Sequence, residues 1–466
     1  MIDLDIASLR AAYETHVLTP EVMIDQLYDE LEQHPLHPVW IHRLSREEAR
    51  QRAADLGAIE GRRHLSLYGI PFAVKDNIDV AGMPTTAGCP DFAYMPTRSA
   101  AVVRSLQQAG AICIGKANLD QFATGLVGTR SPFGKCRNVF DERYLSGGSS
   151  SGSAVAVAKR QVTFALGTDT AGSGRIPAAL NNVVGVKPSR GLFSNEGVVP
   201  ACTSLDCVSV LATSVHDGAR VRDVITGQRT PPSTLPRGFR FAVPSKLEFC
   251  GDTESERLFE SAVRQLQHLG GIRVPVEWGP FAALGDMLYG PWVVERYLSV
   301  GEFLESTPAA GLPVTRKIIL GARRYTATDA FRAFKQTQDL VAICTEVLRG
   351  VHLMVTPTVP THFRVEDDQR DPVSVNDKLG IYSRFVNFLG SPVLAVPAGF
   401  RRDGLPFGVS LVGLPGADGQ LDPYGKAIHE MCGGGPGGKL EIPPLNQGPR
   451  RPTSVPPRML ADEARI

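Results

Sequence analysis

Residues 145–177 read LSGGSSSGSAVAVAKRQVTFALGTDTAGSGRIP, and this stretch decides the fold class predicted here. The small residues 154–159 suit a helix, and the apolar run 162–166 suits a buried strand. Ser149 and Ser173, both glycine-flanked, stand 24 residues apart, each in a turn before an expected helix N-terminus. Unpaired backbone N–H groups at such a terminus favour negative charge. The stretch therefore predicts two serines held in tight turns where an oxyanion can be received.

Helices and short apolar strands alternate on both sides of this stretch. Further strands are expected at 68–74, 111–114, 183–186, 239–244, 272–276, 353–355, 392–397 and 409–412. Further helices are expected at 19–34, 45–57, 99–108, 254–269 and 328–350. This alternation predicts an α/β fold with helices on both faces of a sheet. Active groups in such folds gather on the loops at the strand ends.

The chain divides into one large predicted domain and a tail. Residues 1–415 are expected to form the domain, with the N-terminal helices of residues 19–57 packed at its periphery. Residues 281–326 have a weaker pattern and predict a helical excursion that covers the site. In residues 416–466, 17 of 51 are Gly or Pro, which predicts an extended or disordered tail.

Composition narrows the class of protein. A formal net charge of +1 gives no electrostatic reason to bind nucleic acid or an anionic membrane. No apolar run approaches a membrane span, and the N-terminus lacks the basic start of a secretory signal. The scattered cysteines and ten histidines show no metal-ligand spacing. We therefore expect a cytoplasmic protein without a metal or another cofactor.

Lys75 follows the strand expected at 68–74 and can complete a base, relay and nucleophile set with Ser149 and Ser173. Serine becomes a good nucleophile when a base takes its proton, and a neutral lysine can do so. Burial lowers a lysine pKa from about 10.4 towards the roughly 7–8 that base catalysis needs. The backbone N–H groups of Thr170, Ala171, Gly172 and Ser173 are the predicted oxyanion donors.

Other interpretations of the same residues stay open. A Gly/Ser run is often a flexible linker, and glycines before a helix can cradle phosphate or form a structural turn. A lysine at a strand end is often simply solvated. Neither a phosphate-loop motif nor a G-x-S-x-G elbow is present, which leaves a nucleotide site with little support.

Together these motifs resemble the amidase signature family. The matching segments are GIPFAVKD at 69–76, GKANLD at 115–120, SGGSSSG at 146–152 and GTDTAGSGRIP at 167–177. The resemblance spans roughly residues 19–415 and implies one α/β/α domain on a mixed central sheet. It implies Ser173 as nucleophile, Ser149 as a bridging serine on a cis peptide, and Lys75 as base.

Within the family, residues 118–125, 170–177 and 290–297 look most like allophanate hydrolases. There a tyrosine and an arginine grip the substrate carboxylate, which points to Tyr289 and Arg296. Arginine suits this task because its planar fork pairs with a carboxylate at two atoms. Gly125 and Arg175 are further candidate substrate contacts, although Arg175 can instead brace the nucleophile loop.

The resemblance implies hydrolysis of allophanate (urea-1-carboxylate) through an acyl-enzyme, with ammonia and carbon dioxide as products. It also implies a homodimer and a functional link to a biotin-dependent urea carboxylase. Alternatives are another small-amide amidase, a glutamine-dependent amidotransferase A-type subunit, or a catalytically silent binding subunit. Two departures from the family are expected: no room for a second domain, and a Gly/Pro tail in place of the closing helix.

Overall fold

A computed structural model describes residues 3–33, 38–59, 61, 64–231 and 233–431. Its framework is an 11-stranded sheet in the order β1-β3-β2-β4-β6-β5-β10-β11-β9-β7-β8. The strands are β1 (Trp40–Arg43), β2 (Pro71–Lys75), β3 (Ile112–Ala117), β4 (Phe164–Asp169), β5 (Val184–Lys187), β6 (Cys207–Ala212), β7 (Arg240–Pro244), β8 (Ile272–Val276), β9 (Leu353–Pro357), β10 (Val393–Phe400) and β11 (Pro406–Val412). Each strand expected from the sequence is present, whereas β1 and β6 were not predicted.

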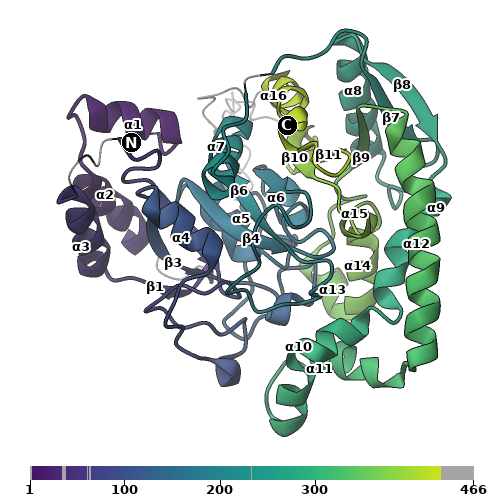
Figure 1. Cartoon of the computed structure of the whole chain (residues 1–466), viewed down its shortest axis with the longest axis horizontal. Coiled ribbons are helices and arrows are strands. Elements are labelled where there is room, and N and C mark those ends of the chain that lie inside the picture. Colours follow the sequence, from purple (N-terminus) through teal and green to yellow (C-terminus); the bar gives the residue numbers. More distant parts are fainter. Residues whose placement is uncertain (1–2, 34–37, 60, 62–63, 232, 432–466) are drawn as a thin grey trace, which may run out of the picture.

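The sheet is mixed, as the family resemblance implies. β2 runs parallel to both β3 and β4, while β6 lies antiparallel between β4 and β5. The helices that cover the sheet are α4 (Ala101–Gln108), α5 (Ser151–Ala158), α6 (Ile176–Leu180), α7 (Val215–Thr226), α8 (Thr253–His268) and α16 (Asp422–Met431). Figure 1 shows these helices around the sheet.

Neighbouring residues of β5 show that the helices lie on opposite faces. Gly185 sits against Ala178 of α6, and a Cβ added there would come within 3.0 Å of the Ala178 Cβ. The next residue, Val186, packs against Gly218 of α7. Successive strand residues point to opposite faces, so α6 and α7 cover different sides of the sheet. The predicted α/β fold with helices on both faces is confirmed.

The N-terminal helices form as the sequence predicts. α2 (Pro20–Gln33) begins with a proline that fits the first helical position. α3 (Arg46–Gly57) is capped by Ser45 and Glu48, which hydrogen-bond each other's backbone N–H in a capping box. A further helix, α1 (Ile6–Glu14), was not predicted. All three contribute side chains to the main hydrophobic core.

The C-terminal boundary needs a correction, because residues 416–431 do not form an extended tail. α16 buries Tyr424 and Ile428, four residues apart, against the domain. Asp422 at its start pairs with Arg222 of α7 at 2.9 Å. The Gly/Pro content that suggested disorder lies mostly after Met431, and averaging over 51 residues hid the amphipathic helix. A helix therefore closes the described part of the chain, and residues 432–466 lie outside the described residues.

The excursion expected at 281–326 is helical. It contains α9 (Gly279–Asp286), the 3₁₀ turn η4 (Met287–Tyr289), α10 (Val293–Ser306), α11 (Pro313–Leu320) and the 3₁₀ turn η5 (Gly321–Arg324). The long helix α12 (Ala327–Arg349) follows, close to the bounds expected at 328–350, and its N-cap is Thr326. Figure 1 shows α10 and α11 projecting at one edge of the molecule, below α12 and α14 (Pro372–Leu379).

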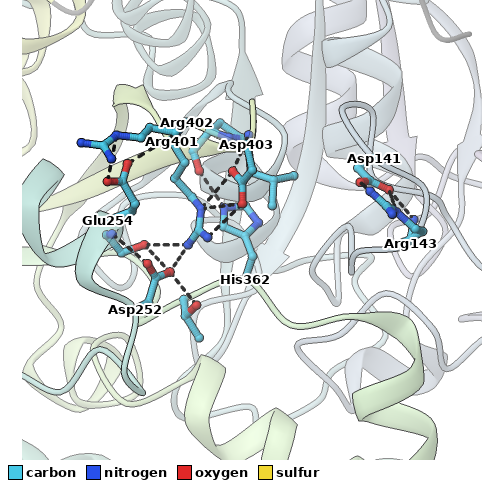
Figure 2. A network of polar contacts seen from close by, with 12 residues as sticks. Asp141, Arg143, Asp252, Glu254, His362, Arg401, Arg402 and Asp403 are labelled. Carbon is cyan, nitrogen blue, oxygen red and sulfur yellow. Dashed lines mark hydrogen bonds and ion pairs between the residues drawn. The ribbon is translucent and has the colours of Figure 1, made fainter. Parts of the chain in front are cut away.

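A polar network fastens the β10–β11 connection to the start of α8 (Figure 2). Arg401 pairs with Asp252, the N-cap residue of α8, and with Asp403. Arg402 pairs with Glu254 in the first turn of α8. His362 bonds the Pro406 carbonyl through Nε2 at 2.6 Å.

Within the residues described above, no helix combines the length and apolar character needed to cross a membrane.

Candidate active site

Two parallel strands end at the centre of the site. β2 ends at Lys75, and its neighbour β4 ends at Asp169, one residue after Thr168. Because parallel neighbours finish at the same edge of a sheet, the chemistry-bearing ends of the two motifs meet there. Both strands are fully buried along their length, so their ends are fixed by the core.

Lys75 has no exposed side-chain surface. Its Nζ donates to the Ser149 Oγ at 2.7 Å and to the Thr168 Oγ1 at 2.6 Å. Burial lowers the pKa of Lys75 to about 7, against the opposing attraction of the Asp120 and Asp169 carboxylates. Near pH 7 the Lys75 amine is therefore neutral in about half of the molecules, and the neutral amine is the state that a general base needs.

Ser149 lies two residues before α5 and is completely buried. The Gly148–Ser149 peptide bond is cis, as the family resemblance implies. The Ser149 carbonyl accepts from the Asp120 N–H at 3.0 Å. The Asp120 carboxylate in turn accepts three backbone N–H groups, from Val127, Gly128 and Arg130. Asp120 thus ties the turn of Ser149 to residues 127–130.

The loop that carries Ser173 is built around Asp169. The Asp169 carboxylate accepts from the N–H groups of Gly172 and Gly174, each at 3.0 Å. Burial alone would raise the pKa of Asp169, but the Arg175 guanidinium beside it keeps that pKa below its usual value. Gly172 has φ +134°, and a Cβ there would come within 2.3 Å of the Ser383 Oγ. Only glycine fits this turn.

Ser173 is nearly buried, with 2% of its surface exposed. Among the described residues, its hydroxyl makes no hydrogen bond, so the link to Ser149 is not formed. The N–H groups of Thr170, Ala171 and Ser173 likewise donate to no described residue, whereas Gly172 donates to Asp169. Three of the four predicted oxyanion donors are therefore available to a ligand.

Arg175 is fully buried and belongs to the loop, away from any open surface. It donates to Asp169 through Nε at 2.9 Å and Nη2 at 2.7 Å. It also donates to the Ser383 carbonyl and the Asn387 Oδ1, each at 2.9 Å. These partners favour the alternative in which Arg175 braces the nucleophile loop.

Arg296 and Tyr289 converge on the segment of residues 123–126. The Arg296 Nη1 donates to the Thr124 Oγ1 at 3.0 Å and to the Ala123 carbonyl at 3.3 Å. The Tyr289 Oη accepts from the Asn376 Nδ2 at 3.2 Å, and the Asn376 Oδ1 accepts from the Leu126 N–H at 2.8 Å. The positive charge of Arg296 also lowers the Lys75 pKa, which places this guanidinium within electrostatic reach of the amine.

Gly125 lies in the middle of the same segment. A Cβ there would come within 2.6 Å of the Asp120 Oδ2, so a side chain would displace the carboxylate that organises residues 127–130. The structure thus links Arg296 directly, and Tyr289 through Asn376, to the segment that holds Gly125. The hydrogen bonds of Arg175 go to other residues.

Sequence reasoning assigned no role to Thr168, Asp120, Asp169 or Asp206, although the first three lie in quoted motifs. Asp206 accepts from the Thr170 Oγ1 at 2.5 Å and from the N–H groups of Ala201 and Cys202. A buried carboxylate needs several donors, and here two come from the same turn and one from Thr170, 36 residues earlier in the chain. For Thr168 and Asp169, their place at a buried strand end was the available signal; Asp206 had none.

The model of the Amidase family matches residues 25–421. This chain belongs to the amidase family. As a member, it is a hydrolase that acts on amide C–N bonds.

Individual relatives narrow the position within the family. The urea amidolyase of Saccharomyces cerevisiae is 42% identical over 406 residues, which cover 84% of this chain and 22% of that protein. The A-type subunit of the glutamyl-tRNA(Gln) amidotransferase of Symbiobacterium thermophilum is 37% identical over 427 residues, covering 82% and 85%. The structure of Kluyveromyces lactis allophanate hydrolase matches with a TM-score of 0.87 and 39% identity, over 92% of this chain and 73% of that one. The chain thus spans about a fifth of the length of the curated urea amidolyase.

Proposed function

We propose that this amidase hydrolyses allophanate, with Ser173 as nucleophile, Ser149 as proton relay and Lys75 as base. The observation that carries the choice of substrate is the free edge of Arg296. Among the described residues only its Nη1 donates hydrogen bonds, while Nε and Nη2 donate none. A guanidinium edge of this kind pairs with a carboxylate at two atoms. Arg296 therefore suits an amide substrate that carries a carboxylate.

Acylation begins with the transfer of the Ser173 proton to the Ser149 Oγ as the Ser149 proton moves to the Lys75 Nζ. The Ser173 Oγ attacks the amide carbonyl carbon, and the oxyanion that forms is held by the N–H groups of Thr170, Ala171 and Ser173. When the intermediate collapses, the C–N bond breaks and the proton returns through Ser149 to the leaving nitrogen, which departs as ammonia.

Deacylation uses the same groups in the same order. Neutral Lys75, through Ser149, takes a proton from a water molecule, and the resulting hydroxide attacks the acyl carbon. The Ser173 Oγ leaves and recovers its proton. The released N-carboxycarbamate then decomposes to carbon dioxide and ammonia. The Lys75–Ser149 hydrogen bond of 2.7 Å and the Lys75 pKa of about 7 support the proton transfer between these two residues.

A second candidate is the release of ammonia from glutamine within an amidotransferase. The specific observation in its favour is the 37% identity to the Symbiobacterium amidotransferase chain, which this chain matches over 85% of its length. Glutamine also carries a carboxylate, so Arg296 does not by itself separate the two functions. The higher identity to urea amidolyase favours allophanate.

One assay separates the candidates. Purified protein is given allophanate, malonamate, glutamine or propionamide, and ammonia release is measured. Turnover of allophanate and malonamate, with little from glutamine or propionamide, supports the proposal. Preferred turnover of glutamine supports the second candidate. Release from none of the four contradicts both candidates.

The proposal includes a cellular setting. An allophanate-hydrolysing enzyme needs a reaction that carboxylates urea, so we propose a functional link to a biotin-dependent urea carboxylase in the cytoplasm. We also propose a homodimer. Light scattering after size-exclusion chromatography tests the dimer, because a 50.2 kDa chain gives well-separated monomer and dimer masses.

A further inference from the structure

The first turn of α10 is held by a carboxylate next to the substrate arginine. Glu295 precedes Arg296 and accepts from the Ser204 N–H at 2.8 Å and from the Ser204 Oγ at 2.6 Å. The Cys202 Sγ donates to the same carboxylate at 3.4 Å. Hydrogen bonds to a charged acceptor are stronger than neutral ones, so this is the firmest of the polar contacts between α10 and the turn.

Two further contacts join α10 to the turn of residues 200–206. The Trp292 Nε1 donates to the Ser204 Oγ at 3.2 Å, on the turn before Glu295. The Ser299 Oγ donates to the Pro200 carbonyl at 2.6 Å, one helical turn further on. The helix is therefore fixed against this turn both in rotation and along its axis.

The turn is joined in its other direction to the nucleophile loop. Asp206 closes it by accepting from the N–H groups of Ala201 at 2.8 Å and Cys202 at 3.0 Å. The Thr170 Oγ1 donates to the second oxygen of Asp206 at 2.5 Å. A continuous polar chain thus runs from Thr170, whose N–H is one of the proposed oxyanion donors, through residues 200–206 to the helix that carries Arg296.

We propose that Glu295 is a positioning residue that sets the place of Arg296 relative to the acyl centre. This inference rests on the proposed function. The Arg296 guanidinium contacts residues 123 and 124 through Nη1 alone. Those two hydrogen bonds therefore do not by themselves fix its position relative to the Ser173 hydroxyl. Among the described residues Glu295 forms no ion pair with Arg296, which leaves the guanidinium edge free for the substrate.

The test compares Glu295→Ala and Glu295→Gln on malonamate, which carries a carboxylate, and on propionamide, which does not. A misplacement of about 1 Å can cost on the order of 100-fold in rate. Glu295→Ala should raise the KM for malonamate roughly 10- to 100-fold while changing kcat for propionamide less than about threefold. Glu295→Gln, which keeps one acceptor oxygen for Ser204, should lie between wild type and Glu295→Ala.

A matched control removes a different charge from the same helix. Glu302→Gln changes an exposed glutamate of α10 and should leave both substrates unaffected. Ser204→Ala removes one donor to Glu295 and should reproduce a smaller rise in the malonamate KM. The rate on propionamide reports in each variant whether the nucleophile and base remain assembled.

A double variant shows whether Glu295 acts through Arg296. If it does, Arg296→Ala and Glu295→Ala/Arg296→Ala should have the same kcat/KM for malonamate, because the arginine to be positioned is already gone. Additive losses would overturn the inference, and so would equal losses on malonamate and propionamide. If Arg296→Ala does not lower kcat/KM for malonamate more than for propionamide, the proposed function fails. If Arg296→Ala shows that selective loss and Glu295→Ala does not, only the positioning role of Glu295 is overturned.

Discussion

The base side of the site and the substrate side are built in different ways. Lys75 and Ser149 are completely buried where two core strands end, and the Lys75 pKa depends on that burial. Arg296 and Tyr289 stand on α10 and η4, a helical arm that packs on the domain through Leu288, Val300 and Leu304 and hydrogen-bonds to its loops, and 39% of Tyr289 is exposed. A substitution that alters the base or the relay serine therefore disturbs the core, whereas a substitution on α10 or η4 can alter substrate preference and leave Lys75 and Ser149 in place.

Ser173→Ala should have the largest effect of any single change. Without the nucleophile no acyl-enzyme forms, and kcat for every amide should fall by on the order of 10⁵- to 10⁶-fold. Ammonia release gives the rate, and thermal unfolding checks that the fold is kept. Ser233→Ala, which removes an exposed hydroxyl, is the control. Residual turnover near the wild-type rate would remove Ser173 from the mechanism.

Lys75→Met should cost roughly 10³- to 10⁴-fold on all substrates, because no base remains to take the serine proton. In the wild type, the base works when neutral, so kcat/KM should fall as pH drops through about 7 and Lys75 becomes charged. The measurement is a pH profile of kcat/KM between pH 5 and 9. A flat acid limb would contradict the neutral-base role.

Thr168→Val tests whether that acid limb belongs to Lys75. The Thr168 hydroxyl accepts from the amine at 2.6 Å and so stabilises its charged form. Its loss should lower the Lys75 pKa further and move the limb to lower pH. An unmoved limb would point to another titrating group.

Arg296→Ala should act on one class of substrate only. Loss of two charged hydrogen bonds should lower kcat/KM for allophanate and malonamate by roughly 100-fold. Propionamide, which has no carboxylate, should lose less than about threefold. Steady-state kinetics on the two kinds of amide measure the difference. Equal losses of kcat/KM on both kinds of amide would show that Arg296 also supports the catalytic residues, and would contradict its role in binding the substrate carboxylate.

Tyr289→Phe should have the smallest effect, less than about tenfold. It keeps the ring, over which the Arg384 guanidinium lies at 4.6 Å from the centroid, and removes only the hydroxyl bonded to Asn376. If that hydroxyl contacts the substrate carboxylate, the KM should rise for malonamate and not for propionamide. A similar change for both would assign Tyr289 to the support of residues 123–126 instead.

The parts of the fold that the sequence predicted are those fixed by local patterns. The helix expected at 45–57 and the strand at 272–276 depend on neighbouring residues, and both form close to the predicted positions. α16 was missed because its ten residues adjoin a Gly/Pro-rich segment. β6 was missed although it is fully buried, and its place between β4 and β5 is a tertiary property.

The site divides in the same way. The motifs around Lys75, Ser149 and Ser173 are contiguous pieces that a family resemblance can identify. The two roles open for Arg175 could be weighed only from its contacts with Asp169, Ser383 and Asn387, the last two more than 200 residues away in the chain. Glu295 and Ser204 are likewise brought together only by folding.

The buried amine also links catalysis to stability. In the unfolded chain Lys75 holds its proton up to about pH 10.5, its ordinary value, whereas in the folded chain it releases the proton near pH 7. Between these values the unfolded chain binds more protons, so the free energy of unfolding decreases as the pH falls. A fall in pH from about 10.5 to about 7 therefore destabilises the fold through the same nitrogen atom whose protonation near pH 7 inhibits the enzyme.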